Sequence, residues 1–222
     1  MKMSNSTTKQ SNISFLMPIQ DRINVRGRGV VVFGTVLSGA IDMGQEVAVI
    51  GNGRRLTARV DTMELFRRPI TRAQAGENVG ILLLRMKPEE FVEGMAVVVP
   101  SNTSSYKTFK ATITLLQQDK DDEYSEDPEY AEYLENSVHL FVLKGRTQIE
   151  LLLWNFHRVR ASISQLFASP DHTTPLEQAV LGDTVYATID LPTDVVLYDK
   201  FEFVIVAGHL KIATAVVTEI IG

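Results

Sequence analysis

The chain has 222 residues, of which 45% are hydrophobic and 22% are charged, and its formal net charge is −5. This composition is typical of a globular protein that buries a core, and no apolar run reaches the ~20 residues needed to span a bilayer. The absence of cysteine excludes disulfides, thiol nucleophiles and cysteine-bound zinc.

The charge divides the chain into two halves of opposite balance. Residues 1–100 carry 13 lysines and arginines against 9 acidic residues, whereas residues 101–222 carry 9 against 18. The length suits two domains of ~100 residues each. We therefore expect two modules with different surfaces.

The first half predicts a disordered tail over residues 1–13 and a β-barrel over residues 14–100. The tail is rich in Ser, Thr, Asn and Lys and lacks the apolar centre of a signal peptide, so we expect a cytoplasmic protein. From Ser14 onward, short apolar runs alternate with turn signals, a spacing typical of sandwiches and barrels. The pair Asn52-Gly53 predicts a tight hairpin, because its turn needs positive φ at both central residues.

The second half, residues 101–222, predicts a further series of short strands. Between Asp119 and Glu135 nine acidic residues accompany one lysine. A calcium loop of the EF-hand type needs a central glycine, whereas this run has none and contains Pro128. A solvated acidic loop, with room for a short helix over "PEYAEYLE", is the preferred interpretation. No long helix is predicted, so we expect the whole chain to be all-β.

Four glycines stand in the stretch "NVRGRGVVVFGTVLSG", residues 24–39. Gly29 and Gly34 have the spacing of a phosphate loop, but Thr35 stands where such a loop requires a lysine. The four residues between these glycines, "VVVF", favour a β-strand. We therefore prefer a strand to a phosphate loop.

No catalytic group stands out in the sequence. The four histidines lie far apart, and there is no Ser/His/Asp arrangement, metal cluster or supported carboxylate pair. We expect a protein without catalytic residues, metal or cofactor. Trp154 lies in an apolar run that predicts a strand, where a core anchor is preferred to a stacking platform.

The run "FLMPIQDRINVRGRGVVVFGTVLSGAIDMGQEVAVIG", residues 15–51, resembles the start of the second domain of elongation factor Tu. Three further runs follow in the family's order, "TMELFRRPI", "AQAGENVGILLL" and "KPEEFVEGMAVVVP". The resemblance implies that the glycine-arginine-glycine turn belongs to a Greek-key β-barrel of the translation-protein type. It also gives the glycines a role, since they allow a kink before a long strand.

A fainter resemblance to the third domain of the same family covers the rest of the chain. It rests on "KTFKATITLL", "VLGDTV" and "FEFVIVAGHLKIATAVVTEIIG". It implies a second, divergent barrel of the elongation factor Tu C-terminal type over residues 101–222. The family's GTPase domain would precede Phe15, where only fourteen residues stand, so we expect this chain to lack that domain and to bind no nucleotide.

The family holds the aminoacyl end of a charged tRNA in a pocket of its second domain. The residues that correspond to that pocket, and form the candidate ligand site here, are Gln20, Asp21, Ile23, Phe33 and Asn78. Asp21 and Asn78 keep the family pattern, whereas Gln20 replaces a glutamate, Ile23 an aromatic residue and Phe33 a threonine. We expect Phe33 to fill space meant for ligand, and we prefer a role for Asp21 and Asn78 in satisfying backbone groups.

The candidate contacts to RNA or phosphate are Arg28, Arg54, Arg55, Arg59 and Lys211. Arg67, Arg68 and Arg72 could join the arginines of residues 54–59 on one edge that tracks phosphates. For the arginines, a solvated face or a contact for the acidic run is the preferred alternative. In the family an arginine-rich turn of the third domain grips the tRNA stem. Here "VAGHLKIA" keeps Gly208 and Lys211 but has Val206 and Leu210 in place of arginines, so we expect no tRNA delivery of the family's kind.

These observations together predict a stand-alone, non-catalytic binding module related to elongation factor Tu. We expect it to engage a protein or ribonucleoprotein partner of the translation apparatus, or to self-associate. The alternative is an RNA- or tRNA-binding module that uses the arginines of the first barrel. No membrane contact is expected.

Overall fold

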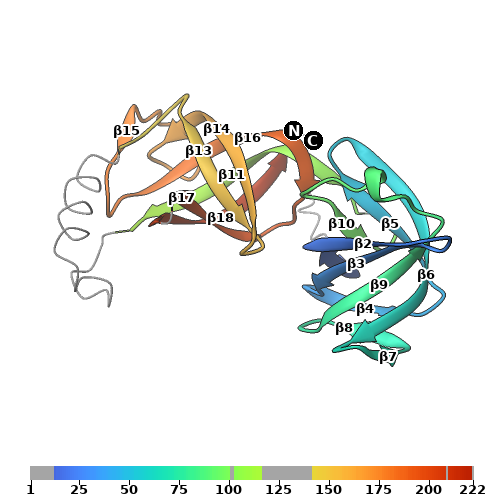
Figure 1. Ribbon diagram of the computed structural model, residues 1–222. Coiled ribbons are helices and arrows are strands. Elements are labelled where there is room, and N and C mark those ends of the chain that lie inside the picture. Colours follow the sequence, from blue (N-terminus) through green and yellow to red (C-terminus); the bar gives the residue numbers. More distant parts are fainter. Residues whose placement is uncertain (1–12, 101–102, 117–141, 209, 222) are drawn as a thin grey trace, which may run out of the picture. The chain divides into compact units, whose positions relative to one another are not determined.

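The structure is a computed structural model that describes residues 13–100, 103–116, 142–208 and 210–221 (Figure 1). These residues form strands and turns with one short 3₁₀ turn, η1 (Pro88–Glu90), so the all-β prediction is confirmed. None of their helices has the length and hydropathy that crossing a bilayer would require. The predicted tail, apart from residue 13, and the acidic run at residues 119–135 lie outside the described residues.

Contacts between Cα atoms divide the chain into two compact units. The first unit comprises Met1–Tyr106 together with Thr193–Asp199, and the second comprises Lys107–Pro192 together with Lys200–Gly222. The first unit thus takes one segment from late in the chain. The domain limits expected from the sequence, after residues 13 and 100, stay a prediction.

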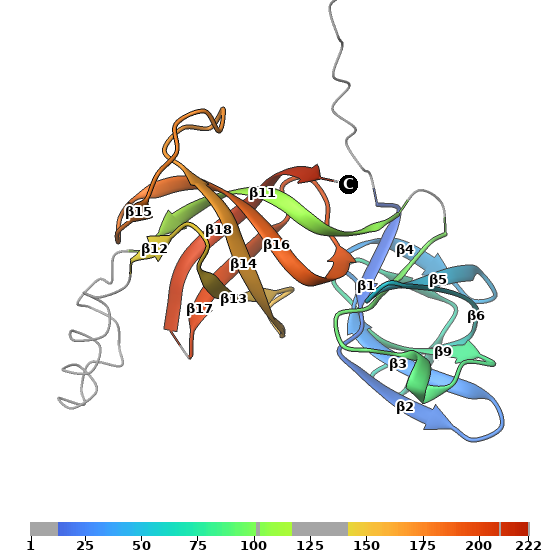
Figure 2. The ribbon, with the colours of Figure 1, turned by 90° about the horizontal axis from the view of Figure 1, so that it is seen from above.

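The first unit is built on a ten-stranded antiparallel sheet with the order β2-β3-β9-β6-β5-β10-β1-β4-β8, and β7 pairs with β6 (Figures 1 and 2). Only Ile19 and Gln20 separate β1 from β2, so these two strands form one bent segment of chain. This segment pairs with β10 through β1 and with β3 through β2, and in this way the sheet closes into a barrel. The strands are β1 (Phe15–Pro18), β2 (Asp21–Val25), β3 (Gly29–Thr35), β4 (Ser38–Asp42), β5 (Glu46–Gly51), β6 (Arg54–Leu65), β7 (Arg68–Ile70), β8 (Arg72–Gln74), β9 (Asn78–Leu84) and β10 (Ala96–Val98).

Alternation along the strands places the core of the first unit inside this barrel. In β3, Val30 and Val32 are buried, whereas Val31 and Phe33, which alternate with them, are partly exposed on the outer face. The stretch predicted as a strand rather than a phosphate loop is therefore a strand. The interior is filled by Phe15, Met17, Val30, Val32, Val47, Val49, Val60, Met63, Ile81, Leu83, Met95 and Val97.

The hairpin predicted at Asn52-Gly53 joins β5 to β6. Both turn residues have positive φ, 54° and 69°, as the sequence requires. Asp194, from the late segment of the first unit, accepts hydrogen bonds from this turn. Its backbone carbonyl accepts the Asn52 N–H at 2.9 Å, and its carboxylate accepts the Gly53 N–H and the Ser105 hydroxyl.

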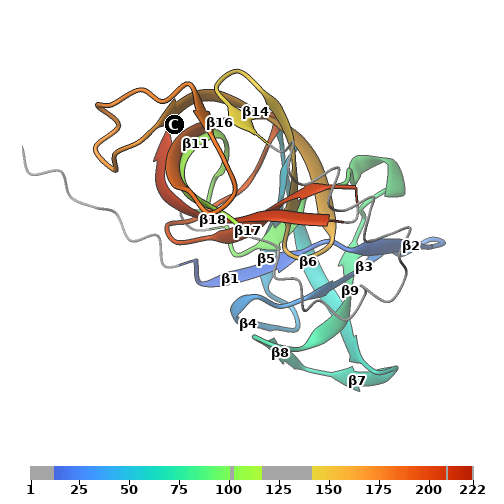
Figure 3. The same ribbon diagram turned by 90° about the vertical axis from the view of Figure 1, so that its left-hand side faces the viewer.

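The second unit is a closed six-stranded barrel with the order β11-β16-β14-β13-β17-β18 (Figure 3). A small two-stranded sheet of β12 and β15 lies beside it. The strands are β11 (Ser105–Leu115), β12 (Leu143–Lys144), β13 (Gln148–Leu153), β14 (His157–Phe167), β15 (Gln178–Ala179), β16 (Thr184–Val196), β17 (Glu202–Ala207) and β18 (Leu210–Ile221).

Trp154 is a buried aromatic residue of the second unit, as predicted, but it lies in the turn between β13 and β14 rather than within a strand. Its side chain is 8% exposed, and its φ of 54° belongs to the hairpin turn. The indole stacks on His157 with ring centroids 5.8 Å apart and lies 6.2 Å from Phe201. The preferred interpretation as a core anchor therefore fits its surroundings.

Candidate binding site

Four neighbouring strands of the first unit, β2, β3, β9 and β6, bring most of the candidate residues together. Asp21 lies opposite Phe33, and Ile23 lies opposite Val31. On the other side of β3, Phe33 lies opposite Gly80 of β9, which is itself opposite Glu64 of β6. Positions far apart in sequence thus form one continuous outer surface.

One end of this surface is a polar cluster centred on Asn78. The Asn78 amide donates to the Gln20 side-chain oxygen at 3.1 Å and to the Thr35 hydroxyl at 3.0 Å. Thr35, directly opposite Asn78, was missed by the sequence reasoning, although the register of β3 with β9 requires this pairing. Asp21 accepts the Arg22 N–H at 2.7 Å. Gln20, Asp21 and Asn78 therefore already have partners within the chain.

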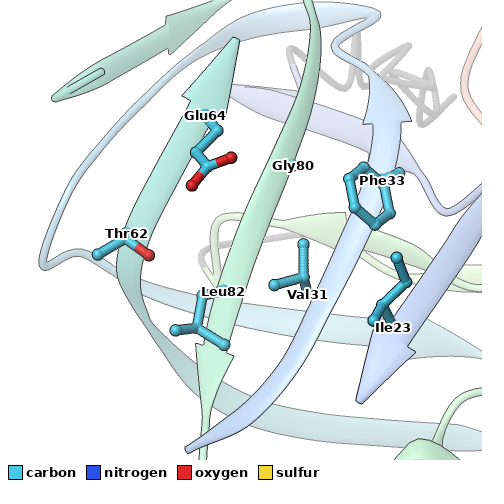
Figure 4. Close-up of a pocket in the computed structure, with 7 residues that line it drawn as sticks. All are labelled: Ile23, Val31, Phe33, Thr62, Glu64, Gly80 and Leu82. Carbon is cyan, nitrogen blue, oxygen red and sulfur yellow. The ribbon is translucent and has the colours of Figure 1, made fainter. Parts of the chain in front are cut away.

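The other end is a depression of about 130 Å³ on the outer face of the sheet (Figure 4). Ile23 and Phe33 are the two predicted residues among those that line it, and Ile23 is 54% exposed. Sequence reasoning missed the others. The full lining consists of Ile23, Val31, Phe33, Thr62, Glu64, Gly80 and Leu82.

Phe33 forms a wall of the depression and leaves it open. Its ring lies against Gly80, where an added Cβ would stand 2.9 Å from Cε1 of Phe33. The absence of a side chain at Gly80 thus provides the space into which the larger residue fits. Phe33 was expected to fill the space for a ligand, but it fills that space only in part.

Glu64 and Thr62 supply the polar side of the depression. Figure 4 shows both on β6, across β9 from Ile23, Val31 and Phe33. Glu64 is exposed, and among the described residues its carboxylate has no hydrogen bond or ion pair. The depression therefore combines an apolar wall with a carboxylate that is available to a cationic or hydrogen-bond-donating group.

The four predicted arginines of the first unit all have partners in the chain itself. Arg28 forms an ion pair with Asp61. The other three donate to backbone carbonyls: Arg54 to Glu89 and Glu90 at 3.5 and 3.3 Å, Arg55 to Pro100 and Thr103 at 2.7 and 2.9 Å, and Arg59 to Gly44 at 2.9 Å. The fifth candidate, Lys211, is an exposed residue of β18 in the second unit. The four arginines therefore make contacts within their own chain.

The hairpin between β6 and β7 carries a different pair of arginines. Phe66 and Arg67 form its turn with φ of 50° and 62°, and Phe66 is 86% exposed. The side chains of Arg67 and Arg68 have no hydrogen bond or ion pair within the part of the chain that the structure describes. Bulky residues at two positive-φ positions are unusual, because such turns favour asparagine and glycine.

The first unit is a β-barrel that is related to translation factors. The family model described as elongation factor Tu domain 2 matches residues 29–98, which run from the start of β3 to the end of β10. Residues 29–98, within the first unit, are therefore similar to elongation factor Tu domain 2. The resemblance of residues 101–222 to the third domain stays a prediction.

Proposed function

We propose that this chain is a non-catalytic, cytoplasmic binding module that engages a protein or ribonucleoprotein partner of the translation apparatus. The observation that carries the proposal is the open depression on the outer face of the elongation factor Tu domain 2 barrel. It offers apolar side chains beside a carboxylate without a partner, which suits an apolar group that carries a donor or a positive charge.

Capture of partners from the protein's own cell lysate tests this proposal. Tagged wild-type protein is compared with Ile23→Arg and Glu64→Arg. Both side chains are exposed, so we expect both variants to fold. Val180→Arg is the matched control, because Val180 is 48% exposed and lies in the second unit. We expect a specific partner that survives RNase, is lost from the first two variants and is kept by the control. Equal capture by all four proteins would contradict the proposal.

RNA binding is the second candidate, and the hairpin tip at Phe66 favours it. An exposed aromatic ring beside two arginines without partners can stack on a base while the arginines contact phosphates. Arg54, Arg55 and Arg59 are less suited, because they already donate to backbone carbonyls of their own chain.

A salt series of RNA binding, followed by fluorescence anisotropy, distinguishes this second candidate. We expect the double variant Arg67→Ala/Arg68→Ala to weaken binding and to lower the slope of log K against log salt by about one per lost contact. Arg72→Ala is the control, because Arg72 already pairs with Asp42 at 2.7 Å. A flat salt response of the wild-type protein would remove the RNA hypothesis.

A further inference from the structure

The second unit carries a short hairpin extension between β14 and β15. The Ala168 N–H donates to the Thr174 carbonyl at 2.9 Å, and the Leu176 N–H donates to the Leu166 carbonyl at 2.8 Å. The tip, residues 169–173, closes through a hydrogen bond of 3.1 Å from the His172 N–H to the Ser169 carbonyl. His172 therefore occupies a hairpin position with φ of 55°, where glycine is usual.

The His172 ring packs on two aromatic side chains of the barrel strands. Its centroid lies 4.8 Å from that of Phe167 and 6.2 Å from that of Tyr186, in edge-to-face arrangements. Its Nδ1 atom is buried and has no hydrogen-bond partner among the described residues. The imidazole is thus held in a form that suits a neutral ring, because a charged ring would place a buried N–H where no acceptor stands.

The charges around His172 come from three elements. Burial lowers the pKa of His172 most, and Lys110 on β11 lowers it further. Glu219 on β18 and Asp171 in the tip oppose these effects more weakly. Lys110 and Glu219 also form an ion pair at 2.7 Å, so their opposite charges partly cancel at the His172 ring.

The tip keeps its shape through contacts that do not involve the imidazole. The Asp171 carboxylate accepts the Ser169 hydroxyl at 2.6 Å, the Thr173 hydroxyl at 2.9 Å and the Thr173 N–H at 3.2 Å. The side chain of His172 is therefore the contact that ties this self-contained turn to Phe167 and Tyr186.

We propose that His172 is a proton-operated latch: the neutral ring holds the tip over Phe167 and Tyr186, and protonation releases it and uncovers an aromatic surface. The closed state is fully favoured above the ordinary histidine pKa and weakens as the pH falls below it, because the open state binds the proton more tightly. This inference is independent of the partner site on the first unit.

An NMR titration of the full chain between pH 8 and pH 5 tests the latch. We expect the Ala168 amide and the Tyr186 ring to move with the midpoint of the His172 ring. Hydrogen-exchange protection of Ala168, corrected for intrinsic rates, should fall by up to about tenfold for each unit by which the pKa of His172 is lowered. The Ile163 amide, which donates to the Thr147 carbonyl in the same barrel, should keep its protection.

Two variants separate the latch from a general effect of acid. His172→Phe keeps the apolar packing without the titrating group, so its tip should stay closed across the range. His172→Gly fits the positive φ but lacks the ring, so its tip should be open throughout. The wild-type titration alone overturns the proposal if the His172 ring titrates while the Ala168 amide keeps its protection. An equal loss of protection in His172→Phe would do the same.

Discussion

Gly34 shows how closely two strands of the first barrel approach. A Cβ at this position would stand 2.2 Å from the Pro18 carbonyl oxygen, which belongs to backbone and cannot rotate away. We expect Gly34→Ala to lower the free energy of unfolding by about 2 kcal/mol or more, through overpacking. Urea denaturation measures this loss. Gly145→Ala is the matched control, because an added Cβ there would meet nothing within 4 Å.

The hydrogen bond from the Ser169 hydroxyl to the Asp171 carboxylate influences the pKa of Asp171 in the hairpin tip. The Ser169 hydroxyl is the largest influence holding the pKa of Asp171 below its ordinary value, followed by Thr173. We expect Ser169→Ala to raise the pKa of Asp171 toward that value, as measured by ¹³C NMR of the carboxyl group. The tip should accordingly lose order at a higher pH when acid is added. Ser164→Ala, which removes a hydroxyl bonded to the Thr188 carbonyl, should leave the pKa of Asp171 unchanged.

Residue identity alone predicts part of the candidate site. Ile23 and Phe33 can be placed together from the family pattern, and both line the depression. Glu64 and Thr62 could not be placed, because the register of β6 with β9 shifts between Val60 and Met63. A bulge of this kind changes which side chains face outward, and no local sequence signal fixes it.

At the scale of elements, the β5–β6 hairpin depends on a residue from far along the chain. Asp194→Ala removes the acceptor for the Gly53 N–H and the Ser105 hydroxyl. We expect a loss of about 1–3 kcal/mol in unfolding free energy, because two donors lose their carboxylate partner. Asp199→Ala, in the same segment, lacks such contacts among the described residues and should change stability little. Equal losses in the two variants would contradict this role.

The same hairpin marks the limit of local prediction. The turn type follows from Asn52-Gly53 alone, because few residue pairs adopt positive φ at both positions. The identity of its cap does not follow, since Asp194 lies 141 residues from Gly53. Contacts between residues so far apart in sequence depend on the full strand topology. The alternation of apolar residues predicts the fold class but not that topology.

At the scale of the molecule, the first unit includes a segment from late in the chain. A chain that ends at residue 106 keeps every strand of the ten-stranded sheet but lacks Thr193–Asp199. We expect it to be less stable than the same unit in the whole chain, with hydrogen-exchange protection at Gly53 reduced most. Asp194→Ala in the whole chain should reproduce part of this loss. Unchanged protection in the truncated chain would show that the segment is dispensable.

The architecture as a whole is the part that sequence predicts best. Short apolar runs with period-two alternation and frequent turn signals leave few alternatives to an all-β fold. Trp154 is an instructive exception, because its apolar neighbours indicate a strand whereas its backbone forms a turn. Burial can be read from hydrophobicity, but the last residue of a strand cannot be distinguished from the first residue of a buried turn.

The alternation in β3 also bears on how such a protein changes over evolution. Val30 and Val32 pack inside the barrel, while Val31 and Phe33 on the same strand line the depression on its outer face. The outward positions can therefore change with little effect on the buried core, whereas the inward positions cannot. Substitutions at the outward positions can thus alter the chemistry of the depression while the inward positions keep the barrel core.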